Sequence, residues 1–120
     1  MAQALIGQPF TFQVLFVDGL NVPLVVNNPV ISIFTFSDVG VRETLVDNQP
    51  LVPVVPPETG RYTYTYTPPE NLTGKLLSAD FVGEDLAIPG TFYRAEQQVT
   101  AVTTLGMGVG GSGLIARFIK

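Results

Sequence analysis

Ten carboxylates are the side chains of this chain best suited to acid–base or metal chemistry. A carboxylate glycosidase needs two carboxyl groups about 5–10 Å apart, and a calcium loop needs acidic or amide side chains at alternating positions before a glycine. No such run is present, and Asp18-Gly19 has no companion acids at ligand spacing. Glu84 and Asp85 are the adjacent acids most worth examining as a pair. We otherwise expect solvated turn acids, with no metal ion and no cofactor; the acids concerned are Asp38, Glu43, Asp47, Glu58, Glu84 and Asp85.

Missing residue types restrict the chemistry further. The chain has no Cys and no His, which removes thiolate nucleophiles, zinc–thiolate sites and the imidazole base of most catalytic triads. Ser112 lies in a glycine-rich run, without the strand–turn–helix context of a nucleophile. Six Lys and Arg against ten Asp and Glu leave a net charge of −4, whereas nucleic-acid binding needs clustered cations. We therefore predict a protein that is not an enzyme, has no catalytic residue and does not bind nucleic acid.

Three tyrosines alternate with threonines over residues 61–67. In a strand, Tyr62, Tyr64 and Tyr66 lie on one face and the threonines on the other. If exposed, the tyrosines would form a platform on which sugar rings stack; if buried, they would be core residues behind a polar threonine face. Strand aromatics are more often core residues, and Trp, which sugar platforms commonly use, is absent. The core interpretation is favoured, and the sugar platform and a protein-interface face stay open as alternatives.

Apolar and polar residues alternate along most of the chain, and this alternation predicts β-strands. No segment has helical periodicity of useful length, and turn signals recur about every 8–12 residues, as in β-sandwiches. At 120 residues the chain matches one domain. We predict an all-β sandwich of about seven strands over residues 1–102. The expected strands are 10–16, 24–26, 30–37, 41–46, an edge or irregular strand at 51–55, 61–67, 75–82 and 92–102.

The C-terminal residues differ in composition from the rest. Residues 97–116 carry no charge, but their five Gly, three Thr, two Gln and one Ser argue against a membrane span. Residues 105–113 are glycine-rich, and residues 114–120 are apolar with two cations. We predict an extended C-terminal arm, residues 103–120, that docks on a neighbouring subunit; the alternative, a strand folded back onto its own sandwich, stays open. The predicted interface residues are Leu105, Met107, Val109, Leu114, Ile115, Phe118 and Ile119, with Leu5, Ile6 and Phe10 as secondary candidates.

Two parts of the sequence are similar to a known family. Residues 58–69 read ETGRYTYTYTPP and are followed by GKL at 74–76, while residues 7–14 read GQPFTFQV ahead of Asp18-Gly19. These runs resemble bacterial and phage immunoglobulin-like domains, over about residues 7–102. The resemblance implies an immunoglobulin-like β-sandwich with Tyr62 at the position of the tyrosine corner. The chain lacks the paired Cys and the Trp of antibody domains, so the resemblance is to the wider fold.

The low charge of the chain indicates a surface that is partly covered by other proteins. Charged residues make up 13% of the chain, against about 25% in soluble proteins, and permanent interfaces are depleted of charge. A small sandwich that is poor in charge, free of Cys and equipped with an apolar arm resembles phage decoration, neck and tail proteins. The resemblance implies a non-enzymatic capsid decoration or cement protein, located in the virion, that binds other virion subunits and its own copies but no membrane. A phage neck or tail component and a carbohydrate-binding module with a tyrosine face are the alternatives.

Overall fold

The structure is a computed structural model that describes residues 2–103 and 114–118. The described residues include no helix that is long and apolar enough to cross a membrane. The elements are β1 (Ala2–Leu5), β2 (Phe10–Phe16), β3 (Val26–Phe36), β4 (Arg42–Pro50), β5 (Val52–Pro53), β6 (Arg61–Tyr66), the 3-10 turn η1 (Glu70–Leu72), β7 (Leu76–Asp85), β8 (Phe92–Val102) and β9 (Leu114–Phe118).

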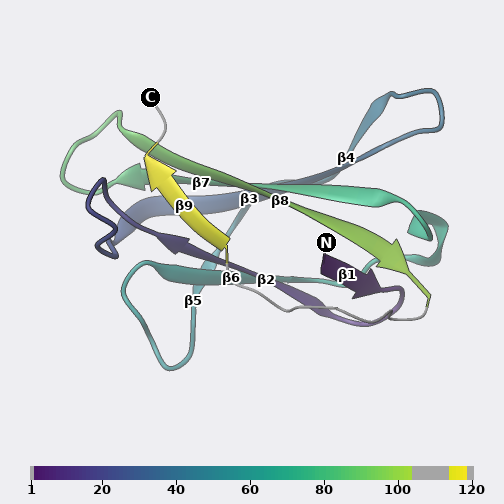
Figure 1. Cartoon of the computed structure of the whole chain (residues 1–120), viewed down its shortest axis with the longest axis horizontal. Coiled ribbons are helices and arrows are strands. Elements are labelled where there is room, and N and C mark those ends of the chain that lie inside the picture. Colours follow the sequence, from purple (N-terminus) through teal and green to yellow (C-terminus); the bar gives the residue numbers. More distant parts are fainter. Residues whose placement is uncertain (1, 104–113, 119–120) are drawn as a thin grey trace.

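The strands form two sheets that pack against each other (Figure 1). One sheet has the antiparallel order β4–β3–β7–β8, and β1 pairs in parallel with β8. The other sheet has the antiparallel order β2–β6–β5. β9 lies between the sheets and pairs with both β2 and β8. The prediction of an all-β protein with the two sheets of a sandwich is confirmed.

The core lies between the sheets and follows from strand alternation. Phe12, Val14 and Phe16 of β2 are fully buried, whereas the residues between them are only half-buried. β7 alternates in the same way and places the Phe81 ring 6.3 Å from the Phe12 ring, centroid to centroid. Successive side chains of a strand point to opposite faces, so each strand gives every second residue to the core. The other residues form the outer faces, and the strand ends position the loops.

One expected strand break is absent from the structure. The strand expected at 24–26 is not a separate element, because β3 begins at Val26 and continues to Phe36. The pairing of β3 with β7 shifts register between Asn27 and Val30, and Asn28 has a φ of 48°. Asparagine tolerates this left-handed conformation. The residues that were expected to form a turn therefore form a β-bulge, and the strand continues past it. β1 was also not among the expected strands, whereas the proline-flanked β5 is an edge strand as expected.

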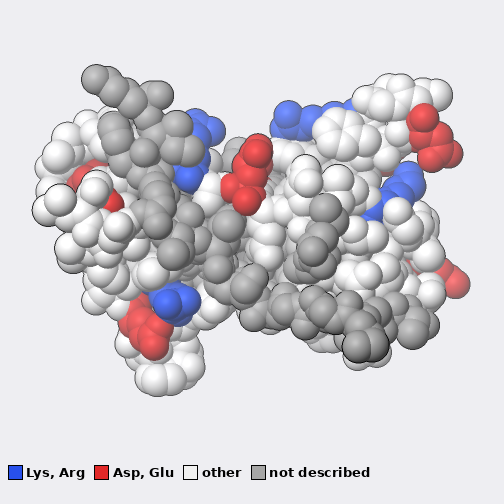
Figure 2. All heavy atoms as spheres, viewed as in Figure 1, with Lys and Arg blue, Asp and Glu red and all other residues white. Residues whose placement is uncertain are grey.

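Charged groups are sparse on the surface. On the face shown in Figure 2, the Lys and Arg side chains and the Asp and Glu side chains are scattered among uncharged atoms, without a large patch of one sign. This distribution agrees with the 13% charged residues of the sequence. Uncharged residues therefore form most of the described surface of this face.

Candidate functional site

Three loops lie toward one end of the sandwich, the left end in Figure 1. They join β2 to β3, β5 to β6 and β7 to β8. The first two are held together because Phe16 N–H donates to Gly60 O at 2.8 Å and Leu24 N–H donates to Phe16 O at 3.0 Å. Val26, which follows the β2–β3 loop, pairs with Asp85, which precedes the β7–β8 loop. We call the exposed aliphatic residues of these loops the loop-end surface; they are Leu20, Val22, Val25, Val55, Leu86 and Ile88.

One carboxylate holds the β2–β3 loop. Asp18 Oδ1 accepts hydrogen bonds from the backbone N–H groups of Leu20 at 2.8 Å and Val22 at 3.0 Å. The Asp18 carbonyl oxygen also accepts a hydrogen bond from Asn21 N–H at 3.0 Å. Aspartate closes turns in this way because its short side chain reaches the N–H group two residues further on. The loop therefore holds Leu20, which is 84% exposed, at a defined position in water.

Glu84 and Asp85 hold the β7–β8 loop in a similar manner. Asp85 Oδ1 accepts a hydrogen bond from Ala87 N–H at 2.8 Å, and Asp85 Oδ2 accepts one from Tyr93 Oη at 2.7 Å. Glu84 Oε2 accepts a hydrogen bond from Gly90 N–H at 3.0 Å. The acidic pair singled out in the sequence thus stabilises a turn that carries two of the loop-end aliphatic residues.

The hydrogen bond between Tyr93 and Asp85 is expected to stabilise the folded protein only within a certain pH range. The Asp85 hydrogen bond raises the pKa of Tyr93 to about 12, and the same bond lowers the pKa of Asp85. The contribution of Tyr93 to stability is therefore present below pH about 10 and is lost as the pH rises through its folded pKa. The contribution of Asp85 is present above pH about 4 and is lost as the pH falls through its lowered pKa.

Asp85→Asn is expected to return the pKa of Tyr93 toward its ordinary value of about 10, because the charged acceptor is removed. The asparagine oxygen can still accept the Ala87 N–H bond, so the loop should persist. Ring-labelled tyrosine NMR against pH measures the ionisation, and Tyr93→Phe identifies the signal. An unchanged late ionisation in Asp85→Asn would show that burial, and not the carboxylate, holds the proton.

The β5–β6 loop contributes the third part of the loop-end surface. The Arg61 Nε and Glu58 Oε2 atoms are 2.6 Å apart, and Arg61 N–H donates to Glu58 O at 3.1 Å. Val55 in this loop is 93% exposed. A hollow of about 320 Å³ lies beside this loop; it is lined by Val25, Pro53, Pro57, Glu58, Thr59, Gly60, Arg61 and Tyr62. Projecting aliphatic side chains and a hollow therefore occur together at this end.

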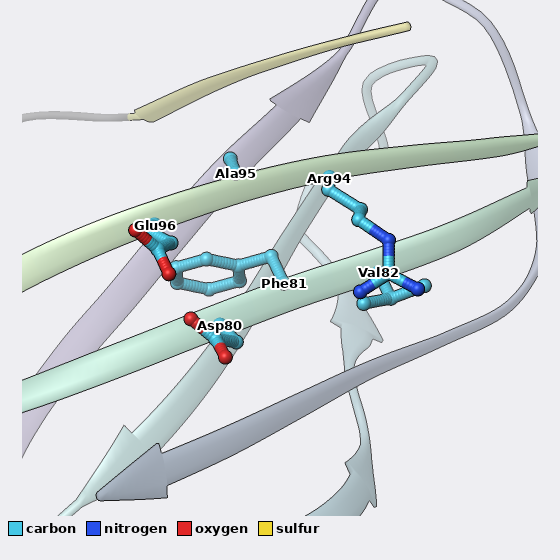
Figure 3. A pocket seen from close by; sticks show the side chains of 6 residues that line it. All are labelled: Asp80, Phe81, Val82, Arg94, Ala95 and Glu96. Atoms are coloured by element: carbon cyan, nitrogen blue, oxygen red, sulfur yellow. The ribbon is translucent and has the colours of Figure 1, made fainter. Parts of the chain in front are cut away.

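A second cluster of polar side chains lies on the outer face of the β4–β3–β7–β8 sheet. Asp80 of β7 is directly opposite Glu96 of β8, and Val82 is opposite Arg94. Figure 3 shows the two carboxyl groups pointing toward each other, while the Arg94 side chain extends toward Val82. Two shallow hollows of about 290 and 260 Å³ lie over this part of the sheet.

The Asp80 carboxyl holds its proton more tightly than an isolated aspartate does. Burial raises the pKa of Asp80, and the hydrogen bond with Glu96 raises it further. Arg42 and Arg94 act in the opposite direction, and these positive charges oppose a metal ion at the pair. Arg42 also stacks on Phe34, with its guanidinium carbon 3.5 Å from the ring centroid. Within residues 2–103 and 114–118, no group of three or more metal-ligating acids is present.

Asp80→Asn is expected to stabilise the protein at neutral pH. Like charges opposite each other in a sheet destabilise it, and exposure screens the effect, so we expect a gain of at most about 1 kcal/mol in unfolding free energy. The folded chain holds the Asp80 proton more tightly than the unfolded chain, so this carboxyl destabilises the folded state as the pH rises through its raised pKa. The gain should accordingly vanish in acid, which urea unfolding at several pH values measures. Asp38→Asn, in the exposed β3–β4 turn, is the control; equal gains in both variants would contradict a specific pair.

The tyrosine row lies on the core side of β6. Tyr62 is buried and contacts Phe16 edge to face, with 5.7 Å between ring centroids. Tyr64 and Tyr66 are half-buried and pack against the same core. Tyr62 is therefore a core residue, and Tyr64 and Tyr66 are partly covered by the core. Sugar binding by this row stays a prediction.

The predicted C-terminal interface is described only in part. Leu114, Ile115 and Phe118 belong to β9, whose backbone pairs with β2 and β8 of the same chain. Ile6 and Phe10, two of the secondary candidates, pack against the core. The interface residues that lie outside the described part are Leu105, Met107, Val109 and Ile119. Docking of the arm on a neighbour therefore stays a prediction.

Two functional features were not expected from the sequence. Asp80 and Glu96 each occupy a polar position of an expected strand, but only the register of β7 and β8 brings them together. The loop-end surface did have a signal, because Leu20 directly follows the Asp18-Gly19 turn. Loops run over the protein surface, so an aliphatic residue within such a polar turn is expected to face water.

Comparisons with known proteins give no relative for this chain. A scan against family models, a search of curated proteins and a search of solved structures each found no match.

Proposed function

We propose that this chain is a non-enzymatic structural protein of a virus particle, a capsid decoration or cement protein that binds neighbouring subunits. The observation that carries the proposal is the loop-end surface, where three loops at the same end of the sandwich hold aliphatic side chains in water. Leu86, for example, is 61% exposed. Exposed apolar surface of this kind marks interaction sites, and loops held by hydrogen bonds lose less entropy on binding. The predicted C-terminal residues are a second contact in the same proposal.

The charges near the loop-end surface favour a protein partner. The three loops carry Asp18 and Glu58, the adjoining end of β7 carries Glu84 and Asp85, and Arg61 is paired with Glu58. These acids, with a net charge of −4 on the chain, are repelled by anionic lipid headgroups and by nucleic-acid phosphates. The surface therefore fits a protein subunit that has an apolar contact area with basic residues around it.

The strand order supports the finer proposal of an immunoglobulin-like sandwich. That fold has strands A, B, E and D in one sheet and C, F and G in the other, with C′ added in variable-type domains. Here β2, β6 and β5 correspond to B, E and D, and β4, β3, β7 and β8 to C′, C, F and G. β9 lies beside β2, where strand A would be. Tyr62 then starts strand E and not strand F, so the expected tyrosine corner does not apply to it.

Particles of the virus that encodes the chain test the proposal. After density-gradient separation, the chain should migrate with the particles, and purified chain should bind particles produced without it. Leu20→Ser combined with Leu86→Ser should weaken that binding by about 10–100-fold, because two side chains that become buried at the contact lose their apolar area. Quantitative gels of pelleted particles measure the affinity.

Val39→Ser is the matched control for the Leu20 substitution. Val39 lies in the β3–β4 turn at the opposite end of β3 and is 85% exposed, nearly the same as Leu20. It should leave particle binding unchanged. A chain that stays in the soluble fraction would contradict the proposal, and equal loss in the Val39 control would contradict the loop-end contact. Recovery with separated tails and not with capsids would support the neck or tail alternative.

A further inference from the structure

β9 closes the gap between the edges of the two sheets (Figure 1). Its residues 114–116 pair in parallel with residues 14–16 of β2. Its residues 117 and 118 pair antiparallel with Arg94 and Tyr93 of β8. One strand of five residues therefore supplies backbone partners to both sheets, and we call the space between these two edges the β2/β8 slot.

The outermost edges of the two sheets are protected against added strands. β4 pairs irregularly with β3 and carries Arg42, Glu43, Asp47 and Pro50. β5 has only two residues, one of which is Pro53. Charges, register irregularities, short length and proline are the features by which proteins prevent edge-to-edge pairing.

The β2 edge of the slot has none of these features. β2 reads FTFQVLF, without a charge or a proline. On the β8 side, Val99–Val102 are already covered by β1, whereas Tyr93 and Arg94 are paired by β9. Unpaired N–H and C=O groups at such an edge are a template for a strand. Among the described sheets, the β2/β8 slot is thus the edge most suited to an incoming strand.

β9 is attached to the slot over a short length and through a long connection. It pairs over three residues with β2 and two with β8, whereas β7 and β8 pair over nine. The connection from β8, residues 104–113, contains five glycines in ten residues. Ten residues span up to about 33–36 Å, enough to reach a neighbouring small domain. A tether of about this length gives an effective concentration on the order of millimolar. Closely packed copies of the chain also reach such concentrations.

We propose that the β2/β8 slot receives the β9 strand of a second copy of this chain when copies are packed together. The exchanged strand makes the same backbone pairs as the strand of the same chain, so exchange costs little and joins the copies. The inference deepens the proposed function by naming the place where the C-terminal residues bind. It can be tested on the purified chain alone, so the two proposals can fail separately.

Disulfide trapping in the full-length chain tests the exchange. The chain has no Cys, so introduced thiols are the only ones present. Leu15 and Ile115 are register partners in adjacent strands, and the spacing of about 4.7–4.9 Å between strands falls within the about 4.4–6.8 Å Cα range of disulfides. Chains with Leu15→Cys and chains with Ile115→Cys, mixed at about millimolar concentration and oxidised, should form a disulfide-linked heterodimer on non-reducing gels.

The control mixture pairs Ile115→Cys with Thr63→Cys, because Thr63 lies on β6, one strand further from β9. It should give much less heterodimer. The chain with both Leu15→Cys and Ile115→Cys should cross-link within itself when dilute and between copies when concentrated. Arg94→Cys with Arg117→Cys repeats the test on the β8 side, should a substitution at Leu15 impair folding. Heterodimer at the control level, or cross-links only within one chain at every concentration, would overturn the proposal.

Discussion

Gly60→Ala is expected to lower the free energy of unfolding by about 3 kcal/mol, one of the two largest effects that we predict for this protein. Gly60 is buried and has a φ of 78°, where a side chain is strained. An added Cβ would lie 2.7 Å from Phe16 O and 2.8 Å from Leu24 O. Both are backbone atoms, and this backbone is held in place because Phe16 N–H donates to Gly60 O and Leu24 N–H donates to Phe16 O. The backbone therefore cannot move away cheaply.

Thermal unfolding measures this effect, and a loss of 3 kcal/mol corresponds to a Tm lower by about 10–15 °C in a domain of this size. Gly74→Ala is the matched control, since Gly74 has the same φ of 78° but nothing within 4 Å of an added Cβ. It should cost only the backbone strain, about 1 kcal/mol. Equal losses at Gly60 and Gly74 would show that the contacts with Phe16 and Leu24 add nothing.

Phe81→Ala is expected to cost about 3–5 kcal/mol, because it removes a fully buried ring and leaves a cavity between the sheets. The ring of Phe81 lies against that of Phe12 of the other sheet. The substitution therefore weakens the packing between the two sheets. Small domains have a total stability of about 5–15 kcal/mol, so this variant should be close to unfolding at physiological temperature. Urea unfolding followed by circular dichroism checks the result.

Val82→Ala is the control for Phe81→Ala. It tests whether the loss of stability comes from the core-facing side of β7 and not from any substitution in this strand. Val82 is the next residue, points to the outer face of the sheet and is half-buried. It should cost less than about 1 kcal/mol, since little apolar area is lost. A comparable loss at both positions would contradict the assignment of the two faces.

Much of the fold could be predicted from period-two alternation. The strands expected at 10–16, 61–67 and 92–102 match β2, β6 and β8 closely, because a strand with one buried face must place apolar residues at every second position. The break expected at Asn27-Asn28-Pro29 was wrong, because a turn signal can be absorbed by a bulge when tertiary pairing continues on both sides. β9 could be foreseen only as one of two alternatives, since a glycine-rich connection fixes no direction for the strand that follows.

The candidate site was less predictable than the fold. Glu84 and Asp85 were recognised as turn acids, but their bonds to Gly90 N–H and Tyr93 Oη required the closed loop. The loop-end surface required the topology, because its residues come from three loops that are far apart in the sequence. Local sequence does not carry the strand order, since non-local pairing is set by how the two sheets pack.

The sequence by itself determined the class of structure and the chemistry that is missing. Alternation and turn spacing are local properties, and the absence of Cys and His is a property of composition, so both can be read without a structure. Only the tertiary structure decided that Asp80 faces Glu96 and that the apolar loop tips share one end. It also decided that β9 can fill the slot between β2 and β8. Each of these depends on register and sheet order, which arise when distant strands bury a common core and satisfy each other's backbone groups.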